Sequence, residues 1–173
     1  MHALRNRGLT LLELMIALAV AGILASIALP SFGRMLEDNR LTQTRNALVA
    51  SLQLARALAV TSGRNVILCA SSDGQRCRAG SDFSLGWLVY RDDNGNGRLD
   101  PGESVRDRHQ LGIGEMRIRS SDGRPQIRFR IRGTASGTNT RLILCDRHPE
   151  RGAQVVVANS GRIRSNMLQG RDC

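Results

Sequence analysis

The chain of 173 residues contains no lysine, since all 25 of its basic side chains are arginine. With 15 acidic residues the net charge is +10, which permits a nucleic acid, an anionic membrane or an acidic protein as partner. Aromatic residues make up only 3% of the chain, which argues against a surface on which unpaired bases stack. The hydrophobic content of 41% is enough for a folded core. The composition alone therefore permits several classes of partner, and the positions of the arginines in the sequence are needed to choose among them.

Histidine is also scarce. The chain has three, His2, His109 and His148, and they form no recognisable metal site or nucleophile–base arrangement. We therefore expect a protein that is not an enzyme and that carries no cofactor.

The N-terminal region contains one long apolar run, LTLLELMIALAVAGILASIAL, in which Glu13 is the only charge. An apolar helix of about 20 residues spans the hydrocarbon core of a bilayer, so we expect residues 9–30 to form a transmembrane helix. The short segment before it, residues 1–8, carries Arg5 and Arg7. By the positive-inside rule this segment stays cytoplasmic and the rest of the chain is exported. A plain single-span anchor is the simplest structure with these features.

The junction RGLTLLE, residues 7–13, resembles the class III leader of type IV pilins and of type II secretion pseudopilins. The resemblance implies that residues 1–8 are a leader peptide, that a prepilin peptidase cleaves between Gly8 and Leu9, and that it N-methylates Leu9. The family usually has Phe or Met at the place of Leu9. The resemblance also implies an inner-membrane protein with a periplasmic domain, incorporated into a pilus or pseudopilus.

Glu13 is the acid that this family requires five residues into the mature chain. A carboxylate in a membrane helix is costly and normally has a partner. When subunits pack helix to helix, the free α-amine of a neighbour's Leu9 supplies a cation, and the apolar surroundings strengthen the pair. We therefore expect Glu13 to act in assembly with other pilins or pseudopilins. The alternative is a side chain that snorkels to the membrane surface.

An amphipathic pattern follows Pro30, which falls at the position where the family's helix bends. Leucine and alanine recur at spacings of three, four and seven, and Gly63 supplies a stop signal. We predict one helix over residues 9–62 with a bend at Pro30, in which residues 31–63 pack on a globular domain, residues 64–173. The residues of the apolar stripe are Leu41, Leu48, Leu52, Ala55, Leu58 and Ala59.

Short alternating or β-branched runs, separated by Gly, Asp, Asn and Pro, follow the helix. They predict an α+β chain in which the long N-terminal helix packs on an antiparallel sheet, an arrangement that matches the pilin fold. The expected strands are Asn65–Ala70, Gly86–Arg91, Glu115–Arg119, Gln126–Arg132, Arg141–Asp146 and Ala153–Asn159, with a last one that begins at Arg162.

Four cysteines lie on the exported side, which predicts disulfides in an oxidising compartment. Three pairings are possible. We favour Cys69–Cys77, which closes a short loop, and Cys145–Cys173, which fastens the tail to a strand. A zinc site is the alternative, although no CxxC pair is present.

Residues 92–103, DDNGNGRLDPGE, fit the calcium-loop pattern, with Asp92, Asn94, Asn96, Gly97 and Glu103 at its defining positions. However, a strand precedes the loop, Pro-Gly opposes an exit helix, and Asn-Gly is equally typical of a hairpin turn. Two of the candidate ligands are neutral amides. FimT/GspH-type minor pilins often carry a similar loop after a strand that contains Trp. We therefore favour a connecting turn and keep calcium as the alternative.

Arginines alternate with apolar residues in the expected strands Glu115–Arg119 and Gln126–Arg132. If the two strands pair as a hairpin, five arginines share one sheet face and repel one another unless a counterion is present. A solvated face is the simpler alternative. The five are Arg117, Arg119, Arg128, Arg130 and Arg132.

A second cluster, Gly161-Arg162-Ile163-Arg164, lies near the C-terminus. In an extended chain Arg162 and Arg164 point the same way, and two planar donors on one edge suit successive phosphates. The motif resembles the GRxR of FimT-type minor pilins, whose basic C-terminal region binds DNA during natural transformation. We expect these seven arginines to bind double-stranded DNA, mainly through its phosphates.

The chain is thus identified as a member of the FimT/GspH family, most similar to FimT-like minor pilins. We expect a minor type IV pilin (FimT/FimU-like) that acts in pilus assembly and binds DNA for uptake. The alternative is a GspH-like minor pseudopilin of the type II secretion system, whose partners are other pseudopilins.

Overall fold

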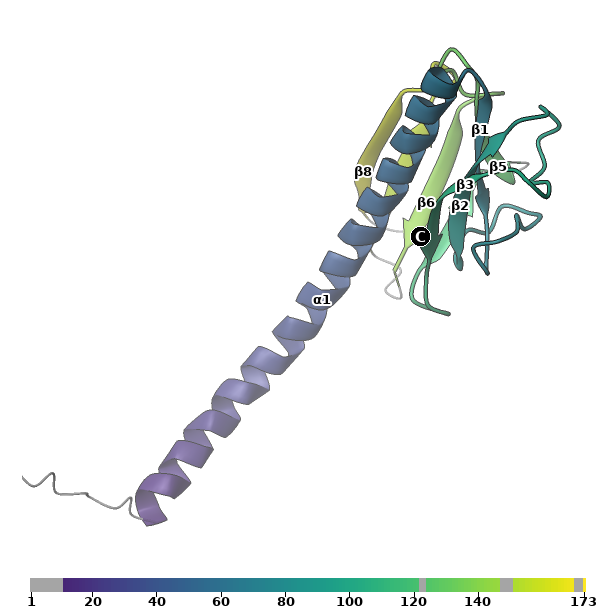
Figure 1. Cartoon of the computed structure of the whole chain (residues 1–173). Helices are drawn as coiled ribbons and strands as arrows, with labels where there is room; N and C mark the ends of the chain where they lie inside the picture. The colour runs from purple at the N-terminus through teal and green to yellow at the C-terminus, as the bar shows by residue number, and fades with distance from the viewer. Residues whose placement is uncertain (1–10, 122–123, 147–150, 170–172) are drawn as a thin grey trace, which may run out of the picture. The chain divides into compact units, whose positions relative to one another are not determined.

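The structure is a computed structural model, and it describes residues 11–121, 124–146, 151–169 and 173, except for the side chains of residues 27–38 and 169. The chain divides into two compact units, one that ends at Asn39 and one that begins at Arg40. A single helix, α1 (Leu11–Ser62), contributes residues to both units (Figure 1). The predicted cleavage site between Gly8 and Leu9 lies outside the described residues.

The first unit consists of the N-terminal part of α1, which remains helical through Pro30. Every side chain from Leu11 to Ser26 is exposed, including Glu13 and the large apolar ones. Among the described residues, we find no helix with the length and apolar character that crossing a membrane requires. Of the predicted 9–30 segment, residues 9–10 and the side chains of residues 27–30 are not described.

The second unit contains two four-stranded sheets in addition to the C-terminal part of α1. The strand orders are β3-β2-β1-β5 in the first sheet and β4-β6-β7-β8 in the second. All neighbouring strands are antiparallel. The strands are β1 (Asn65–Ala70), β2 (Gly86–Asp92), β3 (Val105–Gln110), β4 (Arg117–Ser120), β5 (Gln126–Phe129), β6 (Thr140–Cys145), β7 (Arg151–Val157) and β8 (Ile163–Gln169).

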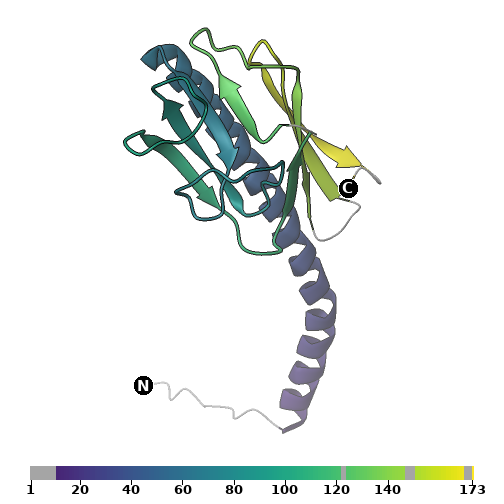
Figure 2. The same ribbon diagram turned by 90° about the vertical axis from the view of Figure 1, so that its right-hand side faces the viewer.

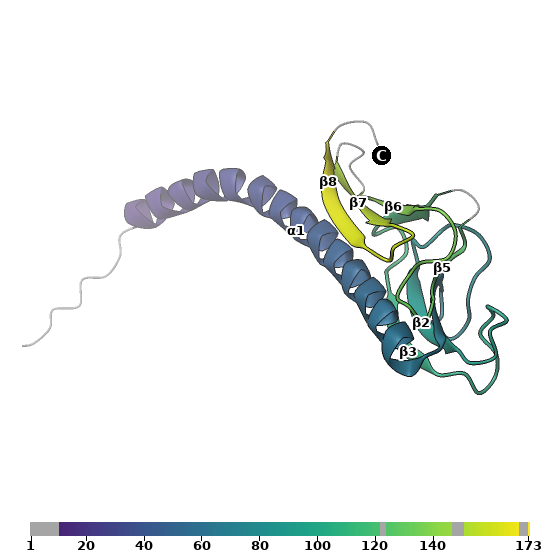
Figure 3. The ribbon, with the colours of Figure 1, turned by 90° about the horizontal axis from the view of Figure 1, so that it is seen from above.

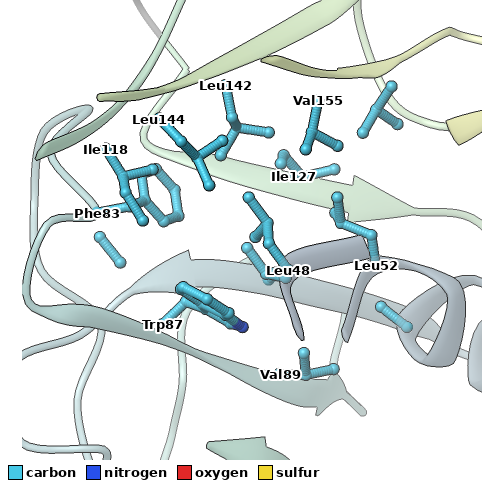
Figure 4. Packing of buried hydrophobic residues seen from close by; sticks show 14 of the residues in the cluster. Leu48, Leu52, Phe83, Trp87, Val89, Ile118, Ile127, Leu142, Leu144 and Val155 are labelled. Atoms are coloured by element: carbon cyan, nitrogen blue, oxygen red, sulfur yellow. The ribbon is translucent and has the colours of Figure 1, made fainter. Parts of the chain in front are cut away.

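The C-terminal part of α1 buries its apolar stripe against both sheets (Figures 2 and 3). In the core, Leu48 and Leu52 of the helix lie among Trp87 of β2 and Leu142 and Val155 of the second sheet (Figure 4). The predicted helix face is confirmed, since its leucines and alanines are buried, apart from Leu58 at the margin of the core. The buried ones are Leu41, Leu48, Leu52, Ala55 and Ala59.

The two sheets differ in how many faces they bury. The first sheet has a second, smaller cluster of Ile67, Cys69, Leu88 and Tyr90 on the face away from the helix core. Its central strands β1 and β2 are therefore apolar almost throughout, as strands covered on both faces are. The second sheet buries one face only, so buried residues alternate with more exposed ones along β4 and most of β6.

Both favoured disulfides are present. Cys69 bonds to Cys77 and Cys145 to Cys173, with the Cα atoms of each pair 5.6 Å apart. No cysteine is free, so the zinc alternative is wrong. One strand, β3, was not predicted, because its sequence VRDRHQ is polar and its residues are exposed or half-buried.

A short polar network ties β2 and β3 to the helix. The indole N–H of Trp87 donates to Ser51 Oγ at 2.9 Å, and the Ser51 hydroxyl donates to Asp107 Oδ2 at 2.5 Å. The imidazole of His109 stacks on the Trp87 ring, with the ring centroids 4.4 Å apart. Burial lowers the pKa of His109, because the charged imidazolium loses hydration there, and Asp107 offsets this only in part.

The lowered pKa of His109 predicts a loss of stability on mild acidification. The unfolded chain protonates His109 at a higher pH than the folded chain does, so the free energy of unfolding falls as pH drops below about 6.5. We expect His109→Gln to flatten this dependence between about pH 7 and pH 5. Urea unfolding at several pH values measures the slope. An unchanged slope in the variant would contradict the assignment to His109.

Candidate nucleic-acid interface

The predicted hairpin of the two arginine-rich strands is wrong. Strand β4 pairs with β6 in the second sheet, whereas β5 pairs with β1 in the first. The apolar side chains of both strands enter the same core, but from opposite sheets. The five arginines therefore do not share one sheet face.

The second sheet instead gathers four arginines on its outer face. Arg117 and Arg119 alternate on β4 with the buried Ile118 and Ser120. Directly paired residues point to the same side of a sheet, and the register makes Val156 of β7 the partner of both Arg141 on β6 and Arg164 on β8. We call this set, Arg117, Arg119, Arg141 and Arg164, the arginine face; all four are exposed.

The remaining residues of this face are uncharged. The register places the following residues between and beside the arginines: Ile143 on β6, Gln154 and Val156 on β7, and Asn166 on β8. Among the described strand residues of this face there is no carboxylate. One acid, Asp82, lies beside Arg119 at the edge of the sheet. Its pKa is lowered, first by a hydrogen bond from Ser84 and further by Arg78 and Arg119.

The arginines of the face differ in their engagement. Arg117 donates from Nη2 to the backbone oxygen of Cys173 at 2.9 Å, so the Cys145–Cys173 disulfide holds the acceptor in place. The side chains of Arg141 and Arg164 make no hydrogen bond or ion pair with any residue that the structure describes. A hollow lined by Arg117, Arg119, Ile143 and the disulfide lies at one end of the face.

Arg162 extends the face toward a neighbouring turn. The turn that precedes β8 packs against the turn that follows β5, since Ala135 N donates to Asn159 O at 2.8 Å. Gly161 adopts a φ of +79°, and a Cβ there would collide with Gly133 O. Gly133 O also accepts a hydrogen bond from Arg56 Nε at 3.0 Å. The glycine of the GRIR motif thus permits the close approach of these two turns.

The other predicted arginines lie in three environments. Arg130 and Arg132 are exposed, Arg132 in the turn before Gly133 and Arg130 just after β5, where its Nε donates to Ser136 Oγ at 3.1 Å. Arg128 is half-buried, and its guanidinium lies against Gly97 in the loop after β2. The structure therefore places Arg128 away from the arginine face. Arg141 was missed, although its alternation with Leu142 and Leu144 in an expected strand could have revealed it.

The loop of residues 92–103 is closed by its own hydrogen bonds. The side chains of Asn94 and Asn96 each accept a backbone N–H two residues on and each donate to Asp100 Oδ2, at 2.8 and 2.6 Å. Glu103 accepts from the backbone N–H groups of Asp93 and Asp100. Within the described ranges, no group of three or more His, Cys, Asp or Glu side chains is arranged to hold a metal ion.

Comparison with known proteins gives the family. The model of the family described as "Type II transport protein GspH" matches residues 44–161, which is more than half of the chain. The chain belongs to the GspH family. It is therefore a minor pilin or pseudopilin of a type IV pilus or type II secretion system, a class of structural components that are not enzymes. The model of the prokaryotic N-terminal methylation motif matches residues 4–29.

Individual relatives agree with this family. The "Pilin-like protein PilA1" of Thermus thermophilus is 34% identical over 166 residues, which cover 92% of this chain and 97% of the relative. The type IV minor pilin FimU of Pseudomonas aeruginosa has the same fold, with a TM-score of 0.59 at 21% identity over 79% of this chain and 98% of FimU. The minor pseudopilin EpsH of Vibrio cholerae gives 0.53 at 15% identity, over 75% of this chain and 97% of EpsH.

The turn contact of this GspH-family protein predicts a specific cost for Gly161→Ala. The substitution forces a side chain into a positive φ and against Gly133 O, so we expect a loss of about 1–3 kcal/mol in the free energy of unfolding. Gly63→Ala is the matched control, because Gly63 has a φ of +64° but nothing within 4 Å of its would-be Cβ. Urea unfolding compares the two. Equal losses would contradict a role for the turn contact.

Proposed function

We propose that this GspH-family protein is a minor type IV pilin that binds double-stranded DNA through the arginine face and Arg162. The observation that carries the proposal is the convergence of arginines from three strands of one sheet on a solvent-exposed face. The absence of carboxylates among the described strand residues of that face leaves its positive charge largely uncompensated. DNA phosphates supply the counterions that such a surface needs.

The geometry suits the backbone of a duplex better than its bases. Residues two apart on a strand are separated by about 6.8 Å, and strands two apart by about 10 Å, so Arg119, Arg141 and Arg164 spread over a broad surface. One guanidinium group can bind two oxygens of a phosphate through two parallel hydrogen bonds. Because the face carries no aromatic side chain among its described residues, base stacking contributes little. Binding is then weakly sequence-selective and strongly salt-dependent.

In this proposal the N-terminal segment mediates assembly of the protein into the pilus. Prepilin peptidase removes the leader, residues 1–8, by cleavage after Gly8 and methylates Leu9, and the match to the N-terminal methylation motif supports both steps. Residues 9–30 anchor the chain in the inner membrane before assembly, with the leader cytoplasmic. In the filament, the exposed apolar side chains from Leu11 to Leu24 pack on neighbouring pilins, and Glu13 pairs with the α-amine of a neighbour's Leu9.

The exported part begins with the amphipathic segment, residues 31–63, and continues into the β-rich domain, residues 64–173. The disulfides suit an oxidising periplasm. A second candidate function is that of a minor pseudopilin of the type II secretion system. The description of the matched family and the fold shared with EpsH favour it.

Gel shifts with residues 31–173, which lack the N-terminal segment up to Pro30, test the DNA proposal. We expect binding at low salt that weakens steeply as salt rises, and weaker binding for the triple variant Arg141→Ala, Arg162→Ala, Arg164→Ala. Each lost phosphate contact should reduce the slope of log K against log salt by about 0.9. The matched control removes three exposed arginines elsewhere, Arg76, Arg98 and Arg106.

The control decides between a local surface and the total charge. Equal weakening in both triple variants would show that net charge alone drives binding and would contradict the arginine face as the site. No shift of the folded domain even at low salt would remove the DNA role and favour the pseudopilin.

A further inference from the structure

We propose that the loop of residues 92–103 binds a calcium ion through the carboxylate of Asp92. Asp92 ends β2 and is 1% exposed, yet its Oδ1 has no hydrogen-bond partner. Its other oxygen, Oδ2, accepts the backbone N–H of Gly97 at 3.1 Å, which turns the carboxylate into the loop. A buried carboxylate oxygen without a donor is costly, and a cation within the loop removes that cost.

Two further oxygens in the same place lack partners. Among the described residues, the only buried side-chain polar atoms without a hydrogen bond are Asp92 Oδ1, the Tyr90 hydroxyl and Ser104 Oγ, and all three lie in or beside this loop. Tyr90 and Asp92 are two residues apart on β2 and thus on one face of the strand. The Tyr90 side chain is fully buried. Its hydroxyl therefore lacks both a protein partner and access to bulk water.

The other candidate oxygens of the loop are held in place by backbone N–H groups. Asn94 Oδ1 accepts from Asn96 N at 3.0 Å, and Asn96 Oδ1 accepts from Arg98 N at 2.7 Å. Glu103 accepts from Asp93 N at 2.9 Å and from Asp100 N at 3.0 Å, one with each oxygen. Each of these oxygens keeps a second lone pair for a cation. Calcium binds such a mixture of carboxylate, amide and backbone oxygens. A calcium site therefore does not require three or more acidic side chains in one cluster.

A connecting turn accounts for the Asn-Gly repeats, but it does not explain why the Asp92 carboxylate is buried with one oxygen unpaired. A turn residue can remain at the surface, where water satisfies its side chain. The neighbouring Asp93 illustrates the difference, because it is half-exposed and forms an ion pair with Arg91 at 2.6 Å. With two neutral amides among its ligands, the loop should bind calcium with a dissociation constant of about 10⁻⁴–10⁻³ M, the range of extracellular calcium modules.

Arg128 adds a constraint of its own. Its guanidinium lies against Gly97, so its positive charge opposes a cation in the loop. Removal of this charge should tighten calcium binding, whereas a surface arginine remote from the loop should have no such effect.

Terbium luminescence of the full chain in detergent micelles tests the site. Tb³⁺ replaces Ca²⁺, and Tyr90, the only tyrosine of the chain, should sensitise its emission. We expect saturable emission that millimolar Ca²⁺ displaces, and calorimetry with Ca²⁺ alone should give the same affinity. The absence of both signals up to about 10 mM Ca²⁺ would overturn the proposal, because that concentration is well above the expected dissociation constant.

Matched variants locate the ion. Asp92→Asn should weaken Ca²⁺ binding by about tenfold or more, Asp93→Asn should leave it unchanged, and Arg128→Gln should strengthen it. Tyr90→Phe should reduce the terbium emission, because it removes the chain's only tyrosine. If Asp92→Asn does not fold, as judged by circular dichroism, Glu103→Gln takes its place. Equal binding by wild type and the folded variant would overturn the assignment. None of these outcomes depends on DNA binding, so failure here leaves the proposed function untouched.

Discussion

The burial of one stripe of α1 by two sheets at once is the constraint on which the rest of the domain depends. Each leucine removed from water contributes about 1.5–3 kcal/mol, and Leu48 and Leu52 belong to a core cluster that includes residues of both sheets. The inner faces of the two sheets must therefore be apolar. Because strand residues alternate, the outer face of the second sheet is then available for charge.

This alternation produces the arginine face from strands that are far apart in sequence. Strand β4 lies at one edge of the second sheet and β8 at the other, with β6 and β7 between them. Two local contacts then hold the basic residues in place. The Cys145–Cys173 disulfide fixes the backbone oxygen that accepts from Arg117, and the contact between Gly161 and Gly133 fixes the turn that presents Arg162.

The features that could be predicted from the sequence are those with a local pattern or few alternatives, such as apolar periodicity and the pairing of four cysteines. The helix stripe, most strand positions and the favoured cysteine pairs agree with the structure. The hairpin of β4 and β5 was wrong because closeness in sequence says little about pairing when two strands serve different sheets. Strand β3 has no apolar alternation to reveal it. The alternation of Arg141 with Leu142 and Leu144 predicts that its side chain is exposed. Its place beside Arg164 depends on the register of β6, β7 and β8, which no local pattern encodes.

The proposed function requires that arginines of β4, β6 and β8 act as one DNA-binding surface. The most direct measurement is a titration of the ¹⁵N-labelled domain with a short duplex, observed at the arginine Nε–Hε resonances. We expect the resonances of Arg119, Arg141, Arg162 and Arg164 to shift together, with one common affinity, while those of Arg76 and Arg106 stay in place. Shifts confined to the first sheet, or spread evenly over all arginines, would contradict it.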